Sequence, residues 1–169
     1  MNLLIPNKPT NAEEFSYQVK SGELFNHLTC SDFNFDSKDI SGGIFSQIIF
    51  NKCSFSATNL QQCLFNQCEF IDCNFINIDS TEVSFIEGEF TRCQFENSQL
   101  VHFNFVKCYL TSASFNNNKI TGGVFQQCDL TRATFSKVAM NTAVFNECQL
   151  VETQFDQCSL VKTTLNTCV

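Results

Sequence analysis

The sequence predicts an all-β solenoid in which one coil takes twenty residues and has four sides. Two observations lead to this fold class. Every fifth residue from Phe25 to Leu165 is apolar, with Ser80 as the single exception and no insertion or deletion in the register. The chain also has 20 Phe and 11 Cys but no Trp, which indicates one core shape used many times. Internal repetition at a fixed period is typical of solenoids.

The five-residue period determines how the chain runs within a coil. An α-helix repeats every 3.6 residues and a strand alternates every two, so neither a helical bundle nor a sandwich fits. The residue two places before each central apolar residue is commonly small or a thiol, as at Cys53, Cys63, Ala113 and Ala133. Positions two apart on an extended chain face the same way. We therefore expect both residues to point inward, and the chain to turn after each pair.

A longer period of twenty residues gives the coil its four walls. The series through Phe25 and the series through Phe35 are Phe at nearly every step of twenty, whereas the series through Ile40 contains no Phe. The series through Cys30 changes from Phe to Leu along the chain. Two opposite walls are thus predicted to carry stacked rings and the other two mostly aliphatic side chains. Seven coils at a strand spacing of ~4.8 Å would form a rod about 34 Å long.

The start of the chain is predicted to form a capping helix over residues 11–20. The segment Thr10–Glu13 has the form of a capping box, and Gly22 stands where a helix would end. Phe15 is expected to cover the first coil, and a loose tail is the alternative. One helical face would present Ala12, Phe15 and Val19.

The other end of the rod is predicted to expose an uncovered coil, because central and inward residues continue into the last coil. We expect two chains to stack through these C-terminal coils, each burying the last coil of its twin. The residues expected at this dimer end are Leu160, Leu165, Cys168 and Val169.

Several segments of the chain resemble the pentapeptide-repeat family, whose consensus places a small residue two before a central Leu or Phe. The resemblance implies a right-handed quadrilateral β-helix of about seven 20-residue coils over residues 23–169, with residues 1–22 as an N-terminal tail and capping helix. The coils are similar to those of the quinolone-resistance group, which protects type II topoisomerases. The segments that carry the resemblance are Cys53-Ser54-Phe55, Cys63-Leu64-Phe65, Cys68-Glu69-Phe70 and Cys73-Asn74-Phe75.

The cysteines are interpreted as small core residues. A disulfide framework would need a secretory context and an even number of cysteines, and 11 is odd. The segment Met1–Pro9 is too short in apolar residues for a signal peptide, and no stretch approaches the ~18 apolar residues of a membrane span. We therefore expect a cytoplasmic chain with reduced thiols and no membrane partner.

No spacing in the sequence supports a nucleophilic triad or a pair of catalytic carboxylates, so we expect a protein that is not an enzyme and has no cofactor or metal. A metal site would need converging ligands, commonly with histidine support, and the chain has 2 His. A thiol-based metal or redox role remains the third alternative for function.

Acidic residues concentrate between positions 69 and 96, where Arg92 is the one basic residue. Glu69 and Glu89 are twenty residues apart and should stack like charge on like, which is unfavourable in neighbouring strands. Attraction of a basic partner surface and simple solubility both account for this acidic belt. The acidic belt comprises Glu69, Asp72, Asp79, Glu82, Glu87, Glu89 and Glu96.

Apolar residues also occur at positions expected to point outward on a single wall. Contiguous exposed apolar surface commonly marks an interface, although scattered outward aliphatic residues are the alternative. This apolar wall comprises Leu24, Ile44, Leu64, Ile86, Val106, Val124 and Val144.

The sequence thus favours a rigid rod that binds a protein partner through its outer walls. The alternative, which the resemblance implies, is a DNA mimic that binds and protects or inhibits DNA gyrase or another type II topoisomerase. Duplex DNA carries about 20 charges over 34 Å, whereas the net charge of this chain is −7, so mimicry is not preferred. Direct nucleic-acid binding is disfavoured, because an acidic chain lacks the basic surface that such binding needs.

Overall fold

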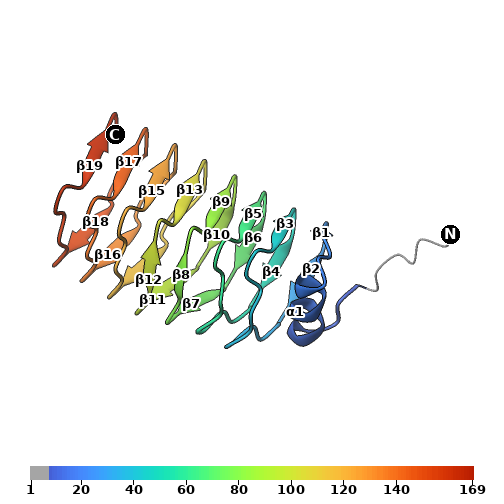
Figure 1. The fold of residues 1–169 in the computed structure, drawn as a ribbon. Helices are drawn as coiled ribbons and strands as arrows, with labels where there is room; N and C mark the ends of the chain where they lie inside the picture. Colours follow the sequence, from blue (N-terminus) through green and yellow to red (C-terminus); the bar gives the residue numbers. More distant parts are fainter. Residues whose placement is uncertain (1–7) are drawn as a thin grey trace.

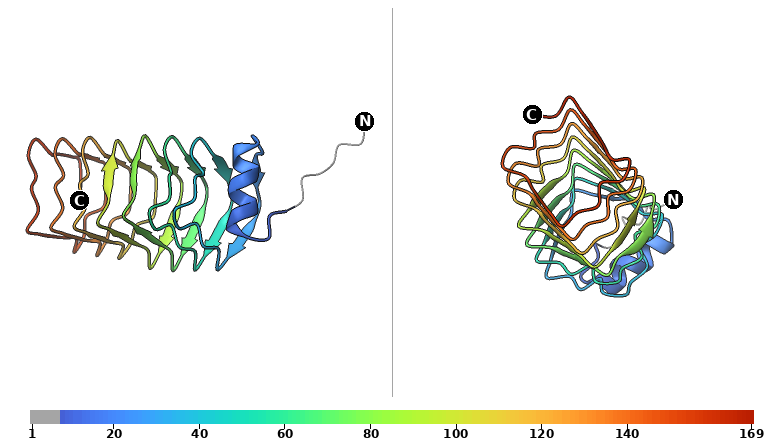
Figure 2. Two further views of the ribbon diagram at one scale, coloured as in Figure 1. Left: turned by 60° about the horizontal axis from the view of Figure 1, so that its bottom comes forward. Right: turned by 90° about the vertical axis from the view of Figure 1, so that its left-hand side faces the viewer.

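The computed structural model describes residues 8–169, which form one short helix followed by a parallel β-solenoid of about seven turns (Figure 1). Seen along the rod, successive coils superpose as four-sided rings (Figure 2). The all-β solenoid with an N-terminal helix is therefore confirmed. The predicted tail over residues 1–22 lies partly outside the described residues, which begin at Lys8.

Four parallel sheets form the walls of the rod. The first wall contains β1 (Phe25–Asn26), β3 (Ile44–Ser46), β5 (Leu64–Asn66), β9 (Ser84–Ile86), β13 (Asn104–Val106), β15 (Val124–Gln126), β17 (Val144–Asn146) and β19 (Thr164–Asn166). The second contains β2 (Thr29–Ser31), β4 (Ile49–Asn51), β6 (Glu69–Ile71) and β10 (Glu89–Thr91). The third contains β7 (Asn74–Ile76), β11 (Gln94–Glu96), β14 (Ser114–Asn116), β16 (Thr134–Ser136) and β18 (Gln154–Asp156). The fourth contains β8 (Asp79–Thr81) and β12 (Gln99–Val101).

The register between coils is twenty residues on every wall. Phe65 pairs with Phe85 on the first wall, and isolated bridges such as that from Glu89 to Tyr109 continue the shorter walls. Outward side chains that lie twenty residues apart therefore form columns along the rod. These columns determine which residues meet at the surface.

The central Phe residues stack within a wall and meet edge-on between walls. The rings of Phe55 and Phe75 lie 4.9 Å apart and are nearly parallel, at 4°. Those of Phe105 and Phe115, on opposite walls, lie 6.3 Å apart at 89°. Offset stacks and T-shaped pairs are the favourable geometries for aromatic rings, each worth about 0.5–1.5 kcal/mol beyond burial. The predicted stacks on two opposite walls are confirmed.

Helix α1 (Ala12–Lys20) caps the first coil as predicted, with Phe15 fully buried. The ring of Phe15 stacks on that of Phe25 at 4.3 Å and so extends the ring column of the first wall. Lys20 forms an ion pair with Asp39 at 2.7 Å, which ties the helix to the coil beneath. At the far end of the helix, Gly22 has a φ of +82°, a value that favours glycine.

The capping box predicted at Thr10 and Glu13 is wrong by one residue. Asn11 has an extended φ of −155° and is the N-cap, and its side chain accepts a hydrogen bond from the backbone N–H of Glu14 at 2.9 Å. Glu14 in turn accepts from the backbone N–H of Thr10 at 2.8 Å. Thr and Asn are both good N-caps, so adjacent candidates could not be ranked from the sequence.

Candidate functional site

The cysteine thiols lie inside the rod. All 11 are free, nine are buried, and Cys158 and Cys168 are partly buried. Burial raises the pKa of the Cys63 thiol and of the Cys30 thiol to about 12. Because the thiolate is the nucleophile and the metal ligand, Cys30 and Cys63 carry little of the reactive form near neutral pH.

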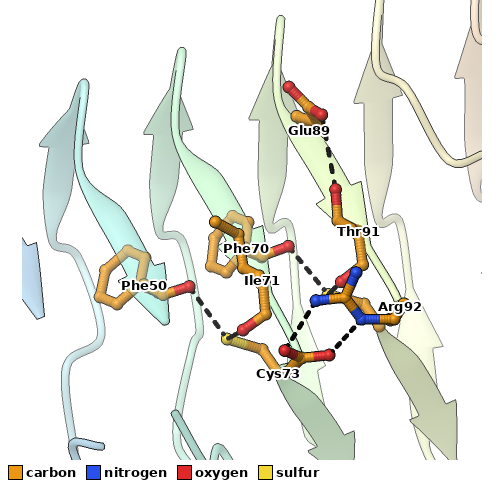
Figure 3. A network of polar contacts seen from close by, with 9 residues as sticks. Phe50, Phe70, Ile71, Cys73, Glu89, Thr91 and Arg92 are labelled. Atoms are coloured by element: carbon orange, nitrogen blue, oxygen red, sulfur yellow. Dashed lines mark hydrogen bonds and ion pairs between the residues drawn. The ribbon is translucent and has the colours of Figure 1, made fainter. Parts of the chain in front are cut away.

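The thiols satisfy backbone carbonyl groups at the corners of the coil. Cys73 Sγ lies 3.3 Å from the carbonyl oxygen of Phe50, one coil earlier (Figure 3). Thr58 Oγ1 and Asn118 Nδ2 make the equivalent bond, each to a carbonyl oxygen 23 residues earlier at 2.8 Å. Since hydroxyl, amide and thiol groups occupy the same place, the shared property is the ability to donate a hydrogen bond. The cysteines therefore have a structural role here.

Within residues 8–169, no three His, Cys, Asp or Glu side chains gather where they could hold a metal ion. Over the same part of the chain, no helix has both the length and the apolar character needed to cross a bilayer.

The acidic belt encircles the rod. Glu96 lies on the third wall, Asp79 on the fourth, and Glu82 at the corner after the fourth wall. Asp72 is compensated by Arg92, whose Nε and Nη2 atoms lie 2.5 and 2.8 Å from its carboxylate oxygens (Figure 3). This pair lowers the pKa of Asp72. The belt is thus a ring around the molecule, and only part of it can contact one flat partner.

The remaining three acids of the belt lie together. Glu69 and Glu89 are direct neighbours in the register of the second wall, and Glu87 occupies the corner before it. They border an open hollow of about 440 Å³. We call this the second-wall hollow; its lining residues are Gln47, Ile49, Gln67, Cys68, Glu69, Glu87, Glu89 and Tyr109.

Tyr109 is the residue of this hollow that the sequence analysis missed. It bridges to Glu89 in the column of outward residues, and its exposed fraction is 61%. Every Phe of the repeat region stands at a central or inward position, so Tyr109 is the one outward aromatic residue of the repeat. Its place twenty residues after Glu89 was a usable signal, because that spacing defines a column.

Two local features of the chain shape the second-wall hollow. Gly88 stands at an inward position between Glu87 and Glu89, where neighbouring coils carry a thiol. A Cβ atom there would lie 3.2 Å from the ring of Phe90, so the space is narrow. Strand β10 is also the last strand of the second wall, and Tyr109 follows it only through an isolated bridge. The continuous strand pairing of the second wall therefore ends beside the hollow.

The apolar wall lies on the first wall, as expected, but its members follow two columns. Ile44 and Leu64 are register neighbours in one column, which Ser84 then interrupts. Ile86 and Val106 continue the apolar surface in the adjacent column. The remaining members, Leu24, Val124 and Val144, stand in the first column.

Exposure varies along the apolar wall. Leu24 is 74% exposed and Ile44 is 49% exposed, whereas the other members are partly buried. Ile86 directly precedes Glu87, so the apolar wall passes beside the second-wall hollow.

The dimer end carries exposed apolar side chains. Leu165 is 54% exposed and Val169 is 83% exposed. Leu160 is also exposed, and Cys168 is partly buried. Nothing covers these residues within the single described chain, so self-association through them stays a prediction.

Comparison with known proteins agrees with this architecture. The family model described as "Pentapeptide repeat region" matches residues 43–125 and 88–165. No curated protein matches the chain. Among solved structures, trypsin-treated QnrB1, a plasmid-mediated fluoroquinolone resistance protein, is 20% identical with a TM-score of 0.47, covering 85% of this chain and 83% of its own.

Two cyanobacterial structures are also similar to the chain. HetL from Nostoc sp. strain PCC 7120, involved in heterocyst differentiation regulation, is 13% identical with a TM-score of 0.31 and covers 95% of this chain and 94% of its own. Rfr23 from Cyanothece 51142 is 12% identical with a TM-score of 0.38, and the match covers 90% of this chain and 95% of Rfr23. With the family model spanning most of the repeat region, the chain belongs to the pentapeptide repeat family.

Proposed function

We propose that the chain is a non-enzymatic, rigid protein-interaction rod that acts in the cytoplasm and binds a protein partner through its outer walls. The observation that carries the proposal is the second-wall hollow, where an exposed aromatic ring lies in line with two stacked carboxylates beside the apolar wall. Exposed aromatic residues are enriched in protein interfaces.

The rigidity of the rod supports this proposal. Each outward side chain is held in a column by parallel pairing on both sides, and the core beneath it is a continuous stack of rings. A surface that is already ordered loses little conformational entropy when a partner binds, which improves affinity. The same feature permits recognition along several coils at once.

Mimicry of DNA against gyrase or another type II topoisomerase is the second candidate. The observation that favours it is the register of like charges on the second wall, where Glu69 and Glu89 stack and Asp129 follows beyond Tyr109. The pairing of Asp72 with Arg92 weighs against an extended row of negative charge. We therefore place it after the general interaction rod.

One experiment separates these two candidates. Purified protein is added to a gyrase supercoiling assay with and without a fluoroquinolone, and a crosslinked pull-down from the native cytoplasm identifies bound proteins. Specific capture of a protein other than a topoisomerase, without any effect on supercoiling, supports the interaction rod. Dose-dependent inhibition or protection supports mimicry. Failure to capture any protein specifically, together with no effect on gyrase, contradicts both.

We also propose that two copies associate through the dimer end, because its exposed apolar residues lie together on the last described coil. Light scattering at high protein concentration should give the mass of a dimer, and Leu165→Glu should give that of a monomer. A monomeric mass for the unchanged chain contradicts the proposal.

A further inference from the structure

We propose that the second-wall hollow docks an extended basic segment of the partner protein, with a lysine or arginine side chain held between the carboxylates of Glu69 and Glu89 and the ring of Tyr109. The inference rests on the proposed function, because it names the chemistry of the partner. It is argued from three features: uncompensated charge in register, an aromatic ring at the rim, and a wall whose backbone is paired to the coils on either side.

The carboxylates of Glu69 and Glu89 are the first feature. Their strands pair in direct register, which places the two residues about 4.8 Å apart along the rod. Like charges directly opposite each other are destabilising. Within the described residues, neither carboxylate forms an ion pair. An incoming cation would relieve this repulsion.

The contrast with the nearby corner column shows that this repulsion is not general. There Asp72 pairs with Arg92 and Glu152 pairs with Arg132, at 2.5 and 2.7 Å. In this corner column, opposite charges lie next to each other and stabilise the pairing of neighbouring coils. On the second wall, the position after Glu89 carries a tyrosine where a balancing cation could stand.

The ring of Tyr109 is the second feature. Its column runs from Ile49 through the two glutamates to Tyr109 and then Asp129. A cation above a tyrosine face is attracted by the ring quadrupole. Ile49, at the other side of the hollow, offers an apolar contact for an aliphatic stem. Lysine and arginine combine such a stem with a cationic head.

The pairing of the wall is the third feature, and it determines how the partner is recognised. The backbone groups of the second wall bond to the coils on either side, for example Glu69 N to Ile48 O at 2.9 Å and Phe90 N to Tyr109 O at 2.9 Å. The partner therefore reads side chains and does not add a strand. The column from Ile49 to Asp129 spans about 19 Å, which suits an extended peptide of about six residues. Phosphate-bearing partners are disfavoured by the same carboxylates.

The test measures the binding of a labelled peptide that alternates lysine with alanine, by fluorescence anisotropy. A second peptide with glutamine in place of lysine is the probe control. The double substitution Glu69→Gln with Glu89→Gln should weaken binding of the lysine peptide about tenfold or more. Tyr109→Ala should weaken it about threefold to tenfold. Added salt should weaken binding by the unchanged protein, because the contacts are exposed.

Matched variants elsewhere on the rod distinguish the site from bulk charge. Glu96→Gln with Asp156→Asn removes the same charge from the third wall, and Tyr17→Ala removes the exposed tyrosine of α1. Both should leave peptide affinity within about twofold. All variants change exposed or partly exposed side chains, and unchanged thermal unfolding verifies that they fold. Equal losses in the control variants, or no binding of the lysine peptide at all, overturn the inference.

The outcomes also separate this inference from the proposed function. If the pull-down captures a partner equally well with the unchanged protein and the Glu69, Glu89 and Tyr109 variants, the interaction rod stands and the basic-segment inference is overturned. If the lysine peptide binds the hollow as expected while no cellular protein is captured, the docking chemistry stands and the proposed function fails.

Discussion

The N-terminal and C-terminal halves of the rod close the corner after the second wall in different ways. In the N-terminal half, the central residue is Phe70 or Phe90 within a strand, and thiols bond the corner carbonyl groups, as Cys93 Sγ does to Phe70 O at 3.2 Å. In the C-terminal half, the central residue is Leu, the strand shrinks to a single bridge, and the backbone closes the corner itself. Ala133 N lies 2.8 Å from Leu130 O there.

The difference shows that one five-residue pattern supports two corner geometries. Where the central residue is Phe70, it stays within a strand that pairs with the next coil. Where it is Leu110 or Leu130, the backbone N–H three residues later bonds its carbonyl within the turn, and at Leu130 the side chain of Thr153 also donates to that carbonyl at 2.8 Å. The change occurs between Phe90 and Leu110, beside Tyr109. The second-wall hollow thus lies where the two halves meet.

The largest expected effect is on the ring stack of the N-terminal half. Phe70→Ala removes stacking with Phe50 at 5.0 Å and Phe90 at 4.9 Å, in addition to leaving a cavity. We expect a loss of about 4 kcal/mol in the free energy of unfolding, measured by urea denaturation. Leu130→Ala in the C-terminal half should cost about 3 kcal/mol. A larger loss at Leu130 than at Phe70 contradicts the added contribution of stacked rings.

Removal of a corner thiol tests the comparison itself. Cys93→Ala removes the thiol that lies 3.2 Å from the Phe70 carbonyl oxygen, whereas Cys93→Ser keeps a hydrogen-bond donor at that place. The Phe70 carbonyl also lies within the pairing of β6 with β10, so the thiol adds to a backbone that is already paired. Cys93→Ala should therefore destabilise the rod by about 1 kcal/mol more than Cys93→Ser does.

Chemical denaturation of the two Cys93 variants provides this measurement. Equal losses for Cys93→Ala and Cys93→Ser mean that this thiol acts only by filling space.

A substitution at a corner residue is expected to raise the stability of the rod, by a smaller amount than the losses above. Thr142 has a φ of +60°, a region that β-branched residues rarely adopt. Thr142→Asn should stabilise the rod by about 0.5–1 kcal/mol, because Asn tolerates this conformation. Asp32→Asn, at a corner with φ +57° and no β-branch, is the control and should change stability little. Thermal unfolding of both variants measures the effect, and a destabilised Thr142→Asn opposes the strain argument.

The smallest expected effect concerns pH. Arg92 lowers the pKa of Asp72 in the folded state. The stabilisation from this pair is therefore present above the pKa of an unfolded aspartate and is lost as the pH falls through the lowered folded value. Arg92→Gln should destabilise the rod slightly at neutral pH and not in strong acid. Urea midpoints across this pH range test it, and an unchanged difference at low pH contradicts the assignment.

Much of the fold follows from the sequence alone, because the core repeat has a strict period. The steps of twenty that join Phe55 to Phe75, and the helical face of Phe15, depend only on which side chains are apolar. The shift of the N-cap from Thr10 to Asn11 could not be foreseen, since both residue types cap well. The change from Phe to Leu along the second wall is visible in the sequence, but the change from strand pairing to closure within the turn depends on the backbone path.

The candidate site was predicted only in part for the same reason. The stacking of Glu69 on Glu89 follows from the period, whereas the hollow depends on Gly88 and on the end of the second-wall sheet. Asp72 was included in the acidic belt because charge was counted along the chain, although the spacing of twenty residues also predicts that Arg92 lies beside it in one column. The apolar wall lies on one wall because the members that precede and follow a central residue both face outward.

The most direct test of the account places a photoreactive phenylalanine analogue at position 109 and irradiates the protein with the labelled lysine peptide. The same analogue at position 17, on the capping helix, and at position 136, on the third wall, provides the reference. We predict crosslinking at position 109 that is lost when lysine is replaced by glutamine in the peptide. Equal crosslinking at all three positions, or none at position 109, contradicts the claim that the second wall holds the docking site.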